Sequence, residues 1–100
     1  MRTTIAKLKS RDGKEAEMRA ALEKMVAAVS ANESDVPKYE LHQDTEDPTV
    51  FYFYEQYENE DAQQAHGTSD HMKQLGADLK GVAGAAPEIS RMTWIAGVNR

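Results

Sequence analysis

Apolar and polar side chains alternate or recur along the chain with two different periods. Alternation over residues 2–9 predicts a β-strand in which Ile5 faces one way and Ala6 and Leu8 the other. Turn-forming residues 10–13 end this strand. From residue 14 to about residue 32, apolar side chains recur every three or four positions, which predicts an amphipathic helix. Its apolar stripe consists of Met18, Leu22, Met25, Val26 and Val29.

The middle of the chain has the pattern of an antiparallel hairpin. Residues 36–43 and 49–57 are predicted strands, joined by about five turn-rich residues. The second strand carries most of the aromatic residues, which fits a central strand covered on both faces. Its alternation separates two sets of side chains. One face receives Phe51, Phe53, Glu55 and Tyr57, and the other receives Val50, Tyr52, Tyr54 and Gln56.

The C-terminal third predicts two short helical segments and a last strand. Residues 59–66 form the first helix, Gly67 interrupts it, and Ser69 is the expected N-cap of the second. Residues 88–98 are the predicted last strand, with Trp94 near its middle. The apolar stripe of the second helix is Met72, Leu75, Leu79 and Val82, and the residues that end it are Gly81, Gly84 and Pro87.

This β-α-β-β-α-β order predicts a ferredoxin-like α+β fold over a single domain, residues 1–100. Right-handed crossovers place the helices on one face of a four-stranded antiparallel sheet. The other face stays uncovered although Ile5 or aromatic side chains point to it. We therefore expect a homodimer whose two sheets pack face to face. The alternative is a monomer with scattered surface aromatics.

The amino-acid composition excludes several classes of binding partner and of chemical site. The chain has 12 Lys and Arg against 17 Asp and Glu, a net charge of −5, which argues against nucleic acid. It has no Cys, so disulfides, thiolate metal sites and cysteine nucleophiles are excluded. We expect a cytoplasmic protein without a membrane partner, because no signal peptide and no long apolar run occurs. Nucleotide-binding and serine-hydrolase motifs are missing.

Three residues are candidates for chemistry. Glu55 lies in an aromatic strand, where a carboxylate is costly unless it is hydrogen-bonded or functional. His66 and His71 lie five residues apart across the helix break, which is not the spacing of a helical zinc site. Metal binding by His66, His71 and Glu55 is the weaker alternative. Acid–base chemistry fits the histidines better, and we expect no metal. The plainer alternatives are a satisfied strand-end carboxylate and two surface histidines.

Four groups of residues follow one another in a distinctive order between about residues 2 and 97. They are residues 39–42 (Tyr-Glu-Leu-His), residues 47–49 (Asp-Pro-Thr), residues 51–57, and His66 with Ser69 and His71. In this order they resemble the antibiotic biosynthesis monooxygenase family, whose small members include quinol monooxygenases. The resemblance implies a dimeric α+β barrel with a pocket between helices and sheet. It also implies oxidation of a phenolic, quinol or polycyclic aromatic substrate with O2, without flavin, haem or metal.

The resemblance also suggests roles for individual residues. His66 or His71 would be the base or proton relay, and Glu55 would orient or balance it. The pocket wall would contain Tyr39, Phe53, Tyr57 and Trp94. The sequence departs from the family where Tyr57 replaces a usual Trp. A non-oxidative metabolite-binding protein or an isomerase dimer of the same fold is the alternative function.

Overall fold

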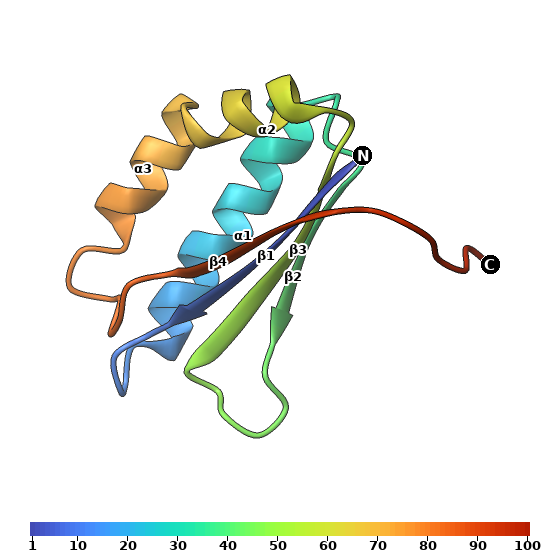
Figure 1. Ribbon diagram of the computed structural model, residues 1–100. Coiled ribbons are helices and arrows are strands. Elements are labelled where there is room, and N and C mark those ends of the chain that lie inside the picture. The colour runs from blue at the N-terminus through green and yellow to red at the C-terminus, as the bar shows by residue number, and fades with distance from the viewer.

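The computed structural model describes residues 1–100 and confirms the ferredoxin-like arrangement. All strand pairs are antiparallel, and the sheet order is β2-β3-β1-β4. All three helices lie on one face of the sheet (Figure 1). The elements are β1 (Arg2–Lys9), α1 (Glu15–Asn32), β2 (Lys38–Gln43), β3 (Val50–Tyr57), α2 (Glu60–Gly67), α3 (Asp70–Asp78) and β4 (Glu88–Thr93).

The core lies between α1, α3 and the two central strands. β1 and β3 pair so that Ala6 is opposite Phe53 and Leu8 is opposite Phe51, and all four side chains are buried. These apolar pairs cover the helix-facing side of the sheet at its centre. The predicted helix stripe closes the core from above, since α1 buries Met18, Leu22, Met25 and Val29.

The break between α2 and α3 is built from two polar caps. Asn59 caps α2 by accepting a hydrogen bond from the Ala62 backbone N–H at 2.9 Å. Ser69 caps α3 by accepting from the Met72 N–H at 3.2 Å, as the sequence predicted. The Ser69 hydroxyl also donates to the His66 carbonyl at 2.8 Å, which ties the end of α2 to the start of α3.

Three predicted boundaries are wrong. The last strand ends at Thr93 instead of residue 98, because Thr93 already pairs with Arg2, the first residue of β1. Trp94 therefore follows the strand. β2 begins at Lys38 instead of residue 36, since Pro37 has no N–H to donate. α3 ends at Asp78, and Gly81 turns the chain with φ +76°.

A backbone crossing closes one end of the fold. Ser10 forms an isolated β-bridge with Ala83, just beyond the end of β1. The Gly84 N–H donates to the Lys9 carbonyl at 2.8 Å, and the Arg11 N–H donates to the Val82 carbonyl at 2.8 Å. A Cβ on Gly84 would lie 2.8 Å from the Ser10 carbonyl oxygen, so only glycine fits there without a backbone shift.

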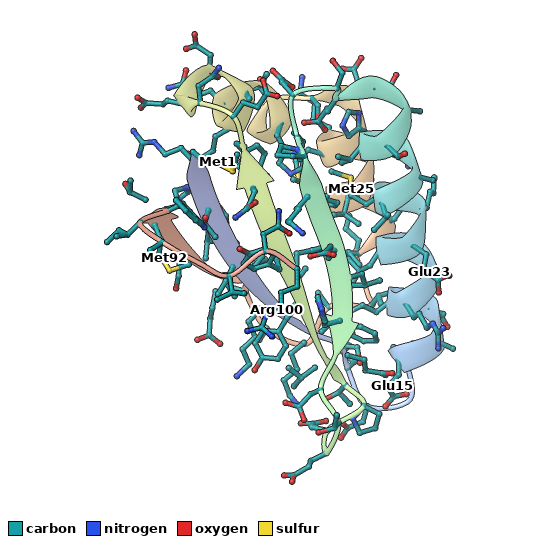
Figure 2. The ribbon with its side chains drawn as sticks, turned by 90° about the vertical axis from the view of Figure 1, so that its right-hand side faces the viewer. Met1, Glu15, Glu23, Met25, Met92 and Arg100 are labelled. Atoms are coloured by element: carbon teal, nitrogen blue, oxygen red, sulfur yellow. The ribbon has the colours of Figure 1, made fainter.

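No helix covers the other face of the sheet. β3 is central, as predicted, but within one chain only its helix-facing side is fully covered. Ile5, Met92 and Trp94 are 37%, 40% and 47% exposed. Figure 2 looks onto this open face, with Met92 on the edge strand and the C-terminal Arg100 in front of the sheet. No helix has the length and apolar content needed to cross a bilayer.

Candidate active site

Strand register arranges the helix-facing side chains in rows across the sheet. One row runs from Arg91 on β4 through Thr4 on β1 and Glu55 on β3 to Tyr39 on β2. The adjacent row is apolar and includes Phe53. The sheet thus presents one polar stripe beside an apolar floor, and both lie beneath α2 and α3.

A cavity of about 240 Å³ occupies the space between these rows and the two short helices. Phe53 forms much of its floor and stacks on Tyr39 with ring centroids 4.4 Å apart. Its polar lining includes Glu55, His66 and Arg91. The remaining apolar lining is Ala6, Leu8, Met72, Leu75, Leu79, Pro87 and Ile89. Such a cavity suits a small, largely apolar ligand with one or two polar groups.

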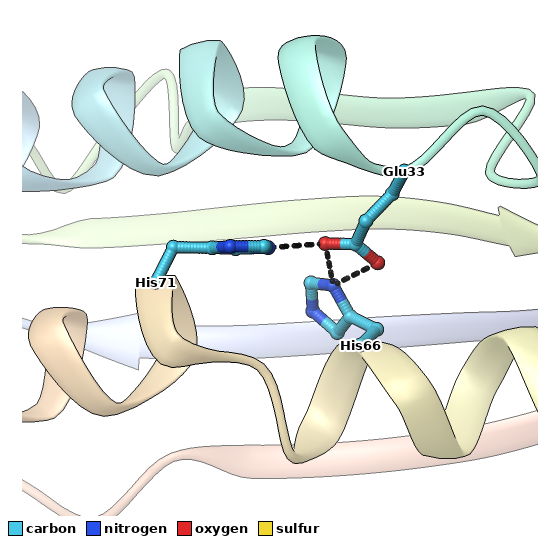
Figure 3. A group of neighbouring side chains, drawn as sticks. All are labelled: Glu33, His66 and His71. Atoms are coloured by element: carbon cyan, nitrogen blue, oxygen red, sulfur yellow. Dashed lines mark hydrogen bonds and ion pairs between the residues drawn. The ribbon is translucent and has the colours of Figure 1, made fainter.

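A carboxylate and two imidazoles meet at the edge of this cavity (Figure 3). The Glu33 oxygens lie 3.1 and 3.0 Å from His66 Nδ1, and Glu33 Oε2 lies 2.5 Å from His71 Nε2. The exposed fractions of the three side chains are 9%, 6% and 19% for Glu33, His66 and His71. The helix break brings the two histidines together, because His66 lies in the last turn of α2 and His71 in the first turn of α3.

Glu33 is the site residue that sequence reasoning missed. It caps the C-terminal end of α1 and lies 33 residues before His66 and 38 before His71. The helical spacing contained a signal, since Glu33 comes four positions after buried Val29. Extending the apolar stripe of α1 by one turn places a carboxylate on the buried side of the helix.

His66 has one ring nitrogen bound and the other free. A carboxylate can only accept, so His66 donates its Nδ1 hydrogen to Glu33, which in the neutral ring leaves the lone pair on Nε2. His66 Nε2 is buried, has no hydrogen-bond partner, and lies 4.0 Å from Glu55 Oε1. The Tyr39 and Tyr57 rings enclose the imidazole, at centroid distances of 5.1 and 5.4 Å. The imidazole is thus held in a fixed orientation with its buried Nε2 available as a candidate base.

Glu55 is only 5% exposed and accepts a hydrogen bond from the Tyr57 hydroxyl. Burial raises the pKa of Glu55 to about 7, although the Tyr57 hydrogen bond and the positive charge of Arg91 oppose this rise. Burial, followed by the negative charge of Glu55, raises the pKa of Tyr39 and Tyr57 well above the usual phenol range. Both tyrosines are therefore neutral hydrogen-bond donors, and Glu55 exchanges its proton near neutral pH.

The structure brings most of the predicted site residues together and separates one of them. His66, Glu55, Tyr39 and Phe53 line the cavity. His71 contacts the site through Glu33, and Tyr57 contacts it through Glu55.

Trp94 lies elsewhere, in a hollow on the open face beside Met1 and Tyr54. Alternation explains this placement: Met92 pairs with Thr3 on the open face, and Trp94 lies two residues further along. Ile89 and Arg91, which sequence reasoning did not select, are the β4 residues that line the cavity.

The sequence profile of the family described as Antibiotic biosynthesis monooxygenase matches residues 1–77. This chain belongs to that family. The resemblance found in the sequence is thereby confirmed. A search of curated proteins finds no match to the chain.

Solved structures share the fold of this family member. A Caulobacter crescentus protein, provisionally named an antibiotic biosynthesis monooxygenase, is 28% identical with a TM-score of 0.89, over 95% of this chain and 90% of that one. The Pseudomonas aeruginosa protein PA3566 is 25% identical with a TM-score of 0.86, over 95% and 94% of the two chains. A Deinococcus radiodurans protein that is 20% identical, with a TM-score of 0.86 over 100% and 98%, shows the fold alone.

Proposed function

We propose that this protein is a cofactor-independent monooxygenase that oxidises a phenolic, quinol or polycyclic aromatic small molecule with O2. One observation carries the proposal: His66 Nε2 is a buried base without a partner at an apolar cavity, while its Nδ1 is held by Glu33. Membership of the monooxygenase family supports it. The chemistry needs a base, an apolar pocket and an electron-rich substrate, and the chain supplies the first two.

An aromatic substrate would lie on Phe53 with its hydroxyl toward His66 and Glu55. The apolar floor and the helix side chains above it exclude water from the ring. Desolvation strengthens the hydrogen bonds between the hydroxyl and the two titratable groups. Arg91 at the same row of the sheet stabilises negative charge that develops on the ring.

The proposed reaction begins when His66 Nε2 takes the phenolic proton. The phenolate gives one electron to O2, and the resulting radical pair joins at a ring carbon as a peroxide, which receives the proton back from His66. His66 then removes the hydrogen of that carbon while the O–O bond breaks. One oxygen atom remains as a carbonyl, and the other leaves as hydroxide, which the His66 proton converts to water. Phenol and O2 thus give quinone and water with no other reductant.

Glu33 and Glu55 have different positioning roles. Glu33 holds the imidazole in the tautomer that exposes Nε2, and it stabilises the imidazolium once the proton is taken. Glu55 lies 4.0 Å from His66 Nε2 and can hold a proton near neutral pH, so it is suited to relay the His66 proton to the peroxide. Tyr57 fixes the Glu55 carboxyl by its hydrogen bond.

The test is oxygen uptake by the EDTA-treated protein with a panel of hydroquinones, naphthols and anthrones. With ¹⁸O₂, we expect a quinone that carries one labelled oxygen atom and no loss of rate from EDTA treatment. Oxygen uptake that EDTA abolishes and a metal restores would contradict cofactor independence. Turnover of a panel compound without O2 uptake would instead favour the isomerase alternative.

A further inference from the structure

We infer that Glu33, His66 and His71 form a binding site for a divalent transition cation of the Zn²⁺ type, on the side of His66 that faces away from the substrate cavity. Binding at this site follows from the geometry of three side chains and does not depend on the proposed reaction. Only its effect on turnover rests on the proposed function.

The ligand set matches the preferences of zinc. Two imidazole nitrogens and one carboxylate oxygen are a common protein ligand set for Zn²⁺, with a fourth position left for water. The ligand atoms of Glu33, His66 and His71 all lie within 4.8 Å of one another. Ligands about 2.0–2.2 Å from a tetrahedral zinc ion are separated by roughly 3.3 Å. The separations of 3.0 Å for His66 Nδ1 and 2.5 Å for His71 Nε2 from Glu33 Oε2 must therefore widen slightly. The two imidazole nitrogens, which lie within 4.8 Å of each other, must adopt the same spacing.

The charges around Glu33 favour a cation. Its carboxylate is 9% exposed and makes no ion pair with Lys or Arg, so the only partners are two imidazoles. Glu55 is close enough to interact electrostatically with Glu33. A buried carboxylate needs compensation by a protonated histidine or by a bound ion. A divalent cation would supply that compensation to both carboxylates.

His71 gives the site contact with solvent. Its side chain is 19% exposed, more than those of the other two ligands. It also lines a small cavity of about 30 Å³ beside Lys24 and Asp78. The exposed edge of His71 lets solvent water supply the fourth ligand that a three-residue zinc site lacks.

Occupancy of this site changes the state of His66. A cation on Nδ1 displaces the hydrogen that Nδ1 donates to Glu33. A neutral imidazole then carries its hydrogen on Nε2, so the atom that faces Glu55 becomes a donor. The cation would thus convert the proposed base into a hydrogen-bond donor and stop substrate deprotonation.

The primary test is titration of the EDTA-treated protein with Zn²⁺ by calorimetry and with Co²⁺ by visible absorption. We expect one ion per chain and the absorption band of a tetrahedral Co²⁺ site. Glu33→Gln and His71→Ala should each weaken binding at least about tenfold, since each removes a ligand. His42→Ala is the matched control, because His42 is exposed on β2, and binding should not change.

Nitrogen-15 NMR of the wild-type histidine rings keeps the test decisive if a variant fails to fold. Zn²⁺ should shift the nitrogen-15 resonances of His66 Nδ1 and His71 Nε2 and leave those of His42 unchanged. No saturable binding, or binding that both ligand variants retain, would overturn the proposal. Equal loss in His42→Ala would show only adventitious surface binding and would overturn it as well.

Activity separates this inference from the proposed function. Zn²⁺ binding by a protein that oxidises no panel compound would support the cation site and count against the monooxygenase proposal. Oxidation of a panel compound by a protein that binds no Zn²⁺ would support the monooxygenase proposal and overturn the cation site. Where both occur, Zn²⁺ should inhibit wild-type turnover, and Glu33→Gln should reduce the sensitivity of its residual turnover to Zn²⁺.

Discussion

The two faces of the sheet carry opposite kinds of unusual residues. The helix-covered face buries titratable groups: Glu55 is 5% exposed and His66 packs above it. The open face exposes apolar groups, including Ile5 and Met92. Successive residues of one strand belong to opposite faces, since Glu55 points toward the helices and Tyr54 points away.

Each face therefore departs from the usual distribution of side chains, in which ionisable groups are exposed and apolar groups are buried. Buried ionisable groups cost free energy and are typical of functional sites. Exposed apolar groups in one continuous region are typical of contacts with another protein. We therefore propose that the chemistry takes place on the covered face, and we expect the open face to contact a second copy of the chain.

The largest effect is expected from His66→Ala on the covered face. Turnover should fall by about 10²–10⁴-fold, because the variant lacks the general base. Oxygen uptake measures the rate, and circular dichroism checks the fold. His42→Ala should keep full activity because His42 is exposed. His71→Ala should have a smaller effect than His66→Ala, since His71 contacts Glu33 and not the cavity. Full activity in His66→Ala would by itself refute the assigned base.

Two apolar residues of β1, one on each face of the sheet, allow the contribution of the two faces to stability to be compared. Leu8 is 7% exposed beneath the helices, and Ile5 is 37% exposed on the open face. Leu8→Ala should lower the free energy of unfolding by about 2–5 kcal/mol because it leaves a core cavity. Ile5→Ala should cost at most about 1 kcal/mol when the chain is monomeric. Urea denaturation at high dilution measures both, and equal costs would contradict the difference between the faces.

Glu55→Gln tests the buried carboxyl by its pH dependence. The pKa of Glu55 is about 7 in the folded protein against 4.5 in the unfolded chain, so folding favours the protonated form. The stability that this contributes is fully present below pH 4.5 and is lost as the pH rises through 7. The difference in the free energy of unfolding is on the order of 3 kcal/mol. Thermal unfolding from pH 4 to 8.5 should show that the stability of the variant relative to the wild type increases as the pH rises.

The matched control for that experiment is Glu40→Gln. Glu40 pairs with Tyr54 on the open face and is exposed, so the same substitution there should give a difference from wild type that hardly varies with pH. A Glu55→Gln curve parallel to the wild-type curve would show that Glu55 titrates normally.

The smallest effect concerns the open face. We expect a homodimer, and Ile5→Asp should weaken it at least about tenfold, which corresponds to about 1.4 kcal/mol, by placing an unpaired charge in the contact. Light scattering over a dilution series measures the dissociation. A wild-type chain that scatters as a monomer at micromolar concentration would show that the open face has no partner copy.

Most of the fold could be predicted because local periodicity and caps specify it. The alternation around Phe51 and Phe53, the stripe of α1 and the Ser69 cap each depend on neighbouring residues alone. The errors lie where distant residues decide. The last strand stops at Thr93 only because β1 begins at Arg2, a fact that no local pattern contains.

The candidate site was predictable in its histidines and in Glu55 but not in its central carboxylate. His66 and His71 are marked by the helix break, and Glu55 by its aromatic neighbours. Glu33 has no such mark beyond the continuation of a helical stripe, and its partners lie more than 30 residues away. The position of Trp94 on the open face could not be foreseen, because the face of each β4 residue depends on the register of that strand with β1.

The backbone crossing at Gly84 sets a limit on how this protein can change its ligand. Leu79 and Pro87, which flank the crossing in sequence, line one side of the cavity. The crossing itself is held by main-chain hydrogen bonds, and Gly84 has no side chain that a substitution could trim. Enlarging the cavity there would require the chain to be rerouted. New specificity is instead accessible through the side chains of Met72 and Leu75 on α3, which single substitutions can shorten without altering the course of the backbone.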